Sequence, residues 1–94
     1  MAILPENESV TDLPTPSIVT VYGADWCGDC RRAKRFLEAT GVPFRYVDLE
    51  ADPEAQQLVD DAGYRAIPVI VTPAGQVLIE PSNDQLAEIV GSAA

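Results

Sequence analysis

The chain contains no histidine, few basic residues, two cysteines and no long apolar run. Without histidine, Cys–His catalysis and histidine-containing metal sites are excluded. Six Lys and Arg against fifteen Asp and Glu give a net charge of −9, and phosphate binding needs local cations, so we expect no nucleic-acid partner. No apolar run approaches the roughly 20 residues that a membrane-spanning helix needs, so we expect no membrane partner.

The two cysteines, Cys27 and Cys30, allow one internal disulfide that would close a very short loop. Such a loop removes little entropy from the unfolded chain, so the disulfide would be a weak structural brace. The first residues, 1–6, lack the basic and apolar segments of a signal peptide. We therefore expect a cytoplasmic protein, and in the reducing cytosol such cysteines are more often catalytic or metal-binding than structural.

The 94 residues predict one domain, residues 17–94, preceded by an extended or mobile N-terminal arm, residues 1–16. The residue pattern predicts strands at 17–22, 44–49, 68–72 and 77–79 and helices at 27–40, at 53–62 and after a cap at Ser82. The first two strands should be parallel because a whole helix separates them. The order β-α-β-α-β-β-α therefore predicts an α/β fold, with a four-stranded mixed sheet and helices on both faces.

The motif Trp26-Cys27-Gly28-Asp29-Cys30 lies where the first strand leads into the first helix. A C-x-x-C at such a junction is typical of a dithiol redox site. Cys27, in the first helical turn, faces unpaired N–H groups and the positive end of the helix dipole, which favour the thiolate. Cys30 lies one turn later and less exposed. We therefore predict Cys27 as the nucleophile, Cys30 as the resolving thiol, and Gly28 as the point of close substrate approach.

The charges around Cys27 act in opposite directions. Arg31 and Arg32 should stabilise its thiolate, whereas Asp25 and Asp29 should disfavour it. We therefore expect Cys27 to ionise less readily than in a site whose middle residues are apolar.

Other interpretations of these residues remain open. The cysteines could be ordinary core residues, or could share a metal or iron–sulfur cluster between two chains, although two thiolates do not complete a four-ligand sphere. Trp26 could belong to the core or could wall a substrate groove. The basic stretch at 31–35 could be a solvated helix face or a binding surface. Pro68 could open an edge strand in the ordinary trans form.

With these motifs the chain resembles the thioredoxin superfamily, and within it the glutaredoxin branch, over residues 17–91. Two motifs carry the resemblance, Trp26-Cys27-Gly28-Asp29-Cys30 and Ala66-Ile67-Pro68-Val69. The resemblance implies a thioredoxin-like fold of glutaredoxin size and thiol–disulfide oxidoreductase activity. It also implies a cis peptide bond before Pro68, and an Ile67 backbone that pairs with a bound peptide or small thiol like an added strand.

Within that branch the chain is most similar to the mycoredoxins of actinobacteria, which use mycothiol where other glutaredoxins use glutathione. Ala24 stands where many glutathione-using members have lysine, and Pro81-Ser82-Asn83-Asp84 replaces their Gly-Gly…Asp signature. The aromatic and basic C-terminal segment of NrdH-type redoxins is not found near residues 80–83. The resemblance therefore implies no tightly bound cofactor, and mycothiol (or glutathione) as co-substrate.

We therefore expect a monomeric enzyme that reduces mixed disulfides between proteins and a small thiol, with mycothiol favoured over glutathione. Its partners would be the small thiol and the mixed-disulfide protein substrates. One alternative is a thioredoxin-like protein-disulfide reductase fed by a flavoprotein reductase, and another is an iron–sulfur cluster carrier. No metal ligand is expected, and the expected substrate-binding residues are Trp26, Gly28, Arg31, Arg65, Ile67, Pro68 and Ser82.

Overall fold

The structure is a computed structural model that describes residue 13 and residues 15–93. The described residues form the strands β1 (Val19–Gly23), β2 (Phe44–Asp48), β3 (Val69–Val71) and β4 (Val77–Ile79), and the helices α2 (Gly28–Thr40), α3 (Pro53–Asp61) and α4 (Asn83–Ala93). Their order along the chain confirms the predicted succession of elements. None of these helices is both long and apolar enough to cross a lipid bilayer.

The strands form one mixed sheet in the order β2-β1-β3-β4. β1 and β2 are parallel, as predicted, whereas β3 is antiparallel to both β1 and β4. Tyr22, near the end of β1, is paired with Val69 at the start of β3. The segment that follows β1 and the segment that precedes β3 therefore meet at the same end of the two central strands, although more than 40 residues separate Tyr22 from Val69.

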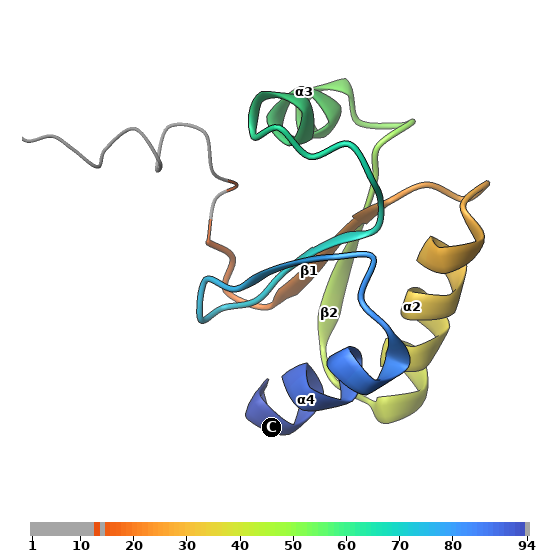
Figure 1. Ribbon diagram of the computed structural model, residues 1–94, viewed down its shortest axis with the longest axis vertical. Helices are drawn as coiled ribbons and strands as arrows, with labels where there is room; N and C mark the ends of the chain where they lie inside the picture. The colour runs from red at the N-terminus through yellow and green to blue at the C-terminus, as the bar shows by residue number, and fades with distance from the viewer. Residues whose placement is uncertain (1–12, 14, 94) are drawn as a thin grey trace, which may run out of the picture.

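Helices cover both faces of this sheet, which confirms the predicted layers (Figure 1). α2 and α4 pack on one face, where Leu37 and Leu86 are fully buried against β1 and β3. α3 packs on the other face through Ala55 and Val59. Leu58, which the sequence pattern placed on the inner side of this helix, is instead 43% exposed, because α3 meets the sheet along a narrower stripe.

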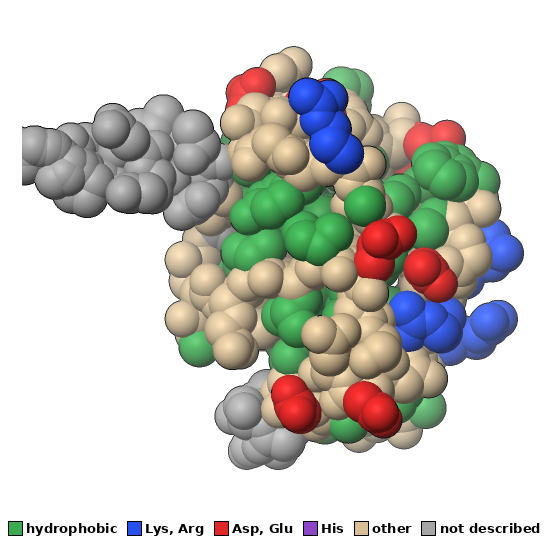
Figure 2. All heavy atoms as spheres, in the orientation of Figure 1, with side chains coloured by type: hydrophobic (Ala, Val, Ile, Leu, Met, Phe, Trp, Pro, Cys, Tyr) green, Lys and Arg blue, Asp and Glu red, His purple; other side chains and the backbone are tan. Residues whose placement is uncertain are grey.

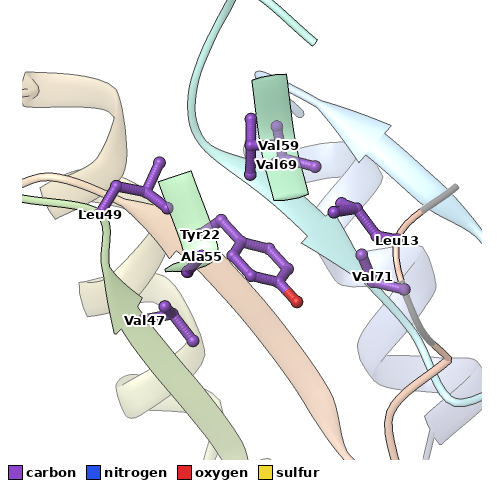
Figure 3. Packing of buried hydrophobic residues seen from close by; sticks show 8 residues of the cluster. All are labelled: Leu13, Tyr22, Val47, Leu49, Ala55, Val59, Val69 and Val71. Carbon is purple, nitrogen blue, oxygen red and sulfur yellow. The ribbon is translucent and has the colours of Figure 1, made fainter. Parts of the chain in front are cut away.

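Leu13 belongs to the core on the α3 side of the sheet. It is 6% exposed and belongs to the same buried cluster as Tyr22, Val59 and Val71 (Figure 3). The sequence pattern predicts that Leu13 belongs to the arm at 1–16, because prolines and acidic residues surround it and a single apolar residue forms no periodic pattern. The packed domain therefore extends to Leu13, while the prediction for residues 1–12 and 14 lies outside the described residues.

The helix ends are set by local signals that the sequence displays. The Asp52 carboxylate accepts a hydrogen bond from the Ala55 N–H at 3.1 Å and caps α3. Ser82 and Gln85 form the predicted reciprocal capping box before α4. Gly41 adopts a left-handed conformation with φ of 80° and ends α2.

Candidate active site

Cys27 caps the N-terminal end of α2. Its Sγ accepts a hydrogen bond from the backbone N–H of Cys30 at 3.2 Å. Its thiol lies 3.8 Å from the carbonyl oxygen of Ile67, to which it donates. The position at the helix terminus is as predicted, and both the N–H group and the helix dipole stabilise negative charge on this sulfur. Cys27 is 9% exposed, so most of the residue is covered by its neighbours.

Cys30 lies behind Cys27 and is fully buried. Burial raises the pKa of the Cys30 thiol to about 12, and the hydrogen bond and charge of Cys27 and the charge of Asp29 add to the effect. Cys30 is therefore a neutral thiol at physiological pH in the reduced protein, whereas Cys27 has the position for attack. The roles of Cys27 as nucleophile and Cys30 as resolving thiol stay predictions, for which this geometry supplies the required arrangement.

The Ile67–Pro68 peptide bond lies beside the two cysteines and is cis. The trans alternative is thereby excluded, and the conformation implied by the family resemblance is confirmed. Pro68 is fully buried, whereas Ile67 is half-buried and faces the space next to Cys27 with its carbonyl. The antiparallel pairing of β1 with β3 brings this segment to the site.

A groove of about 320 Å³ is lined by Trp26 and Ile67, the neighbours of Cys27, and by residues of α3, whereas Cys27 itself is not part of the lining. Trp26 lines it and is 66% exposed, so Trp26 is a groove wall and not a core residue. Ile67 and Arg65, two further residues predicted to bind substrate, also line it. The polar lining also includes side chains that the sequence did not single out, namely Glu50, Gln56, Asp60 and Tyr64.

Besides Pro68, which is fully buried, three other predicted binding residues lie outside the lining of this groove. Arg31 donates a hydrogen bond to the backbone carbonyl of Asp25. Ser82 accepts a hydrogen bond from the Gln85 N–H at 3.2 Å, so its hydroxyl caps α4. Gly28 is exposed, and a side chain there would meet only the Arg31 guanidinium at 3.9 Å. The fold therefore brings Trp26, Ile67 and Arg65 together but not Arg31 or Ser82.

The glutaredoxin family model matches residues 19–78, which include both cysteines and the cis-proline segment. The chain belongs to the glutaredoxin family. A protein of Mycobacterium tuberculosis strain H37Rv that is named as a glutaredoxin is 33% identical over 70 residues, covering 72% of this chain and 83% of that protein. The glutaredoxin-like protein NrdH of Lactococcus lactis is 34% identical over 53 residues, covering 56% of this chain and 74% of that protein.

Among solved structures, the NrdH-redoxin of Escherichia coli has the same fold, with a TM-score of 0.69, 24% identity, and coverage of 76% of this chain and 92% of that one. This member of the glutaredoxin family is therefore a thiol–disulfide oxidoreductase with a thioredoxin-like fold. The two cysteines of its C-x-x-C differ in burial, which is the arrangement that thiol–disulfide exchange uses.

Sequence reasoning missed two residues that this glutaredoxin places directly beneath the dithiol. A side chain at Gly23 would come within 2.8 Å of the Cys30 Sγ and 3.0 Å of the Tyr46 hydroxyl. Burial raises the pKa of Tyr46 to about 12, with the neighbouring Cys30 as the next cause. The sequence marked Gly23 only as the end of a strand, because pairing of β1 with β2 is needed to bring Tyr46 near it.

Proposed function

We propose that the protein reduces mixed disulfides between cytoplasmic proteins and a low-molecular-weight thiol, and that mycothiol is favoured over glutathione. The observation that carries the proposal is the groove lined by Trp26 and Ile67, the neighbours of Cys27, which is open at the surface and large enough for part of a small thiol. The small thiol acts as a co-substrate, with no resident cofactor, and the protein acts as a monomer.

The charge of the groove supports a neutral thiol. Arg65 is its one cation among the lining residues, and Glu50 and Asp60 are acids. Glutathione carries a net negative charge, so two carboxylates in the wall disfavour it. Mycothiol has no ionised group besides its thiol and carries many sugar and inositol hydroxyls. Carboxylates, an amide and aromatic faces are suited to hold such hydroxyls and rings.

The mycobacterial relative adds support, because mycothiol is a thiol of actinobacteria and the M. tuberculosis protein is 33% identical over 70 residues. The missing lysine at Ala24 points in the same direction, since Ala24 also lines the groove and supplies no cation.

The reaction begins when the Cys27 thiolate attacks the small-thiol sulfur of the mixed disulfide. A new S–S bond joins Cys27 to the small thiol, the bond to the substrate protein breaks, and the protein sulfur leaves with the electron pair and takes up a proton. A second small-thiol thiolate then attacks the adduct. This step releases the small-thiol disulfide and restores the Cys27 thiolate.

Cys30 offers a second way to resolve the adduct. Its attack on the Cys27 sulfur would release the small thiol and form the Cys27–Cys30 disulfide. Part of what raises the pKa of Cys30 is the hydrogen bond and the charge of Cys27. Both disappear once Cys27 is joined to the small thiol, so Cys30 becomes easier to deprotonate at the stage when it is needed.

The test compares the reduction rates of a mycothiolated protein, the same protein glutathionylated, and an intramolecular protein disulfide. We expect the mycothiolated substrate to react fastest and Cys27→Ser to abolish all turnover. Cys30→Ser should retain activity on the mixed disulfides if the second small thiol resolves the adduct. Faster turnover of the glutathionylated substrate would contradict the choice of thiol.

Neutralising the acids of the groove tests whether their charge sets the preference between the two small thiols. The double variant Glu50→Gln/Asp60→Asn removes both acids from the lining. Relative turnover of the glutathionylated substrate should rise by about 3- to 10-fold, because an exposed charge contributes up to about 1 kcal/mol. The double variant Glu38→Gln/Asp61→Asn is the matched control, since it also removes two exposed acids but neither of them lines the groove. An equal effect of both variants would show that only net charge matters.

A second candidate function is a thioredoxin-like reductase of protein disulfides that receives electrons from a flavoprotein reductase. It is favoured by the 34% identity over 53 residues to the NrdH protein of L. lactis. The two functions differ in their need for a small thiol. NADPH consumption with thioredoxin reductase and an intramolecular protein disulfide, in the absence of any small thiol, would support this candidate and count against the first.

A further inference from the structure

The guanidinium group of Arg32 bridges two parts of the chain, the corner at 81–83 and the first turn of its own helix. Its Nη2 donates to the carbonyl oxygen of Pro81 at 2.8 Å, and its Nη1 donates to the side-chain oxygen of Asn83 at 2.7 Å. Its Nε lies 3.7 Å from a carboxylate oxygen of Asp29, between the two cysteines. On the face shown in Figure 2, Lys and Arg side chains gather over α2 and next to the start of α4. One side chain therefore connects the dithiol motif to the corner between β4 and α4.

The conformation of that corner places the Pro81 carbonyl within hydrogen-bonding distance of Arg32. Glu80 is the one residue other than glycine with a positive φ among the described residues, at 48°, and it turns the chain out of β4. Pro81, which follows, is fully buried. The Glu80 N–H donates to the Pro68 carbonyl at 2.9 Å, which continues the β3–β4 ladder by one pair. The corner is thus bonded on one side to the cis-proline and on the other side to Arg32.

These contacts form a continuous series that begins and ends next to the Cys27 sulfur. Ile67, which precedes the cis-proline, accepts the hydrogen bond from the Cys27 thiol at 3.8 Å. The adjacent Pro68 is hydrogen-bonded to the β4–α4 corner, and the corner is hydrogen-bonded to Arg32. Arg32 in turn contacts Asp29, two residues from Cys27. A displacement of the corner would therefore move the Ile67 backbone relative to the sulfur.

We propose that Arg32 is a positioning residue for the dithiol reaction, acting in two separable ways. Its hydrogen bonds to Pro81 and Asn83 hold the Ile67–Pro68 backbone in register with Cys27. Its charge partly compensates Asp29, so that the carboxylate opposes the Cys27 thiolate less than it would alone. The inference concerns the thiol–disulfide exchange common to the family and does not depend on which small thiol is used.

A lysine at position 32 would keep the compensation of the Asp29 charge but would lose the positioning of the corner. The planar guanidinium has several donors in a fixed fork and reaches the Pro81 carbonyl, Asn83 and Asp29 together. A lysine ammonium is a single point charge on a flexible chain, so it can compensate Asp29 but cannot hold the same corner. Arg32→Lys should therefore lose positioning and keep charge compensation, whereas Arg32→Gln should lose both.

The experiment measures two rates on each reduced, full-length variant. Alkylation of Cys27 by iodoacetamide requires the thiolate but no aligned backbone. Reduction of a short peptide with an intramolecular disulfide requires both the thiolate and the Ile67 backbone. We expect Arg32→Lys to alkylate at nearly the normal rate but to reduce the peptide about 10-fold more slowly. Arg32→Gln should also alkylate about 2- to 5-fold more slowly.

Arg35→Gln is the matched control, because Arg35 is exposed on the same helix and its replacement removes the same charge. Both of its rates should stay near those of the unmodified protein. A slowing of peptide reduction by Arg35→Gln equal to that by Arg32→Gln would overturn the proposal, since the general charge of α2 would then explain it. Normal peptide reduction by Arg32→Lys would overturn the positioning role.

Asn83→Ala provides an independent measurement if Arg32→Gln does not fold. It removes one of the two corner contacts and leaves Arg32 and Asp29 in place. Peptide reduction should slow about 3-fold, as expected for one lost hydrogen bond, with alkylation of Cys27 unchanged. Unchanged peptide reduction, or equal slowing of both reactions, would contradict the separation of the two roles.

Discussion

Replacing Gly23 with alanine should destabilise the reduced protein, because β1 ends directly beneath the buried Cys30. The new Cβ would lie 2.8 Å from the Cys30 Sγ, 3.0 Å from the Cys30 Cβ and 3.0 Å from the Tyr46 hydroxyl. Favourable contacts between carbon atoms lie at about 3.5–4.0 Å, so each neighbour is too close. Gly23 is not among the glycines with positive φ, so the backbone itself would accept alanine. The expected cost is therefore steric.

The size of the effect follows from two opposing contributions. Inserting a methyl group into a well-packed interior costs about 1–3 kcal/mol. Alanine also restricts the unfolded chain, which returns about 0.4–1 kcal/mol. The free energy of unfolding should therefore fall by about 1–2 kcal/mol, which for a chain of this size lowers Tm by roughly 4–15 °C. Displacement of Cys30 should slow formation of the Cys27–Cys30 disulfide as well.

Urea unfolding of the reduced protein measures this cost, with Gly28→Ala as the control for a glycine in the same motif. A side chain at Gly28 meets only the Arg31 guanidinium, at 3.9 Å, so its stability should be unchanged or slightly higher. In the double variant Gly23→Ala/Cys30→Ala the nearest clashing atom is gone, and at least about 0.5 kcal/mol should be recovered. A Gly23→Ala protein as stable as the original, or no recovery in the double variant, would refute the steric argument.

Three further outcomes are expected. Burial raises the pKa of Cys30 from 9.0 to about 12, so the folded state keeps a proton that the unfolded state loses. The free energy of unfolding should therefore fall by about 1.4 kcal/mol per pH unit above roughly pH 9, with a flatter slope for Cys30→Ser in urea titrations. Leu13→Ala should cost about 2–5 kcal/mol in the same assay and Leu58→Ala less than about 1 kcal/mol; equal costs would contradict the burial of Leu13. Asp29→Asn should increase the thiolate fraction of Cys27, measured by ultraviolet absorbance at neutral pH, and an unchanged fraction would argue against that charge effect.

The sequence by itself determined those features whose signals are local. Asp52 followed by Pro53, the pair Ser82 and Gln85, and Gly41 mark helix ends because capping involves only residues within one turn. The C-x-x-C at a strand-to-helix junction likewise determined the positions of the two thiols, with Cys27 at the helix end and Cys30 buried behind it, since a single helical turn sets their geometry.

Only the tertiary structure decided the features that join distant segments. Leu13 looked like part of an unstructured arm because its contact with Val71 lies across more than 50 residues. Arg31 and Arg32 are adjacent and chemically identical, yet one bonds a carbonyl of its own loop and the other reaches Pro81. Side-chain direction and partner depend on how α2 and α4 pack together, and no local pattern encodes that packing.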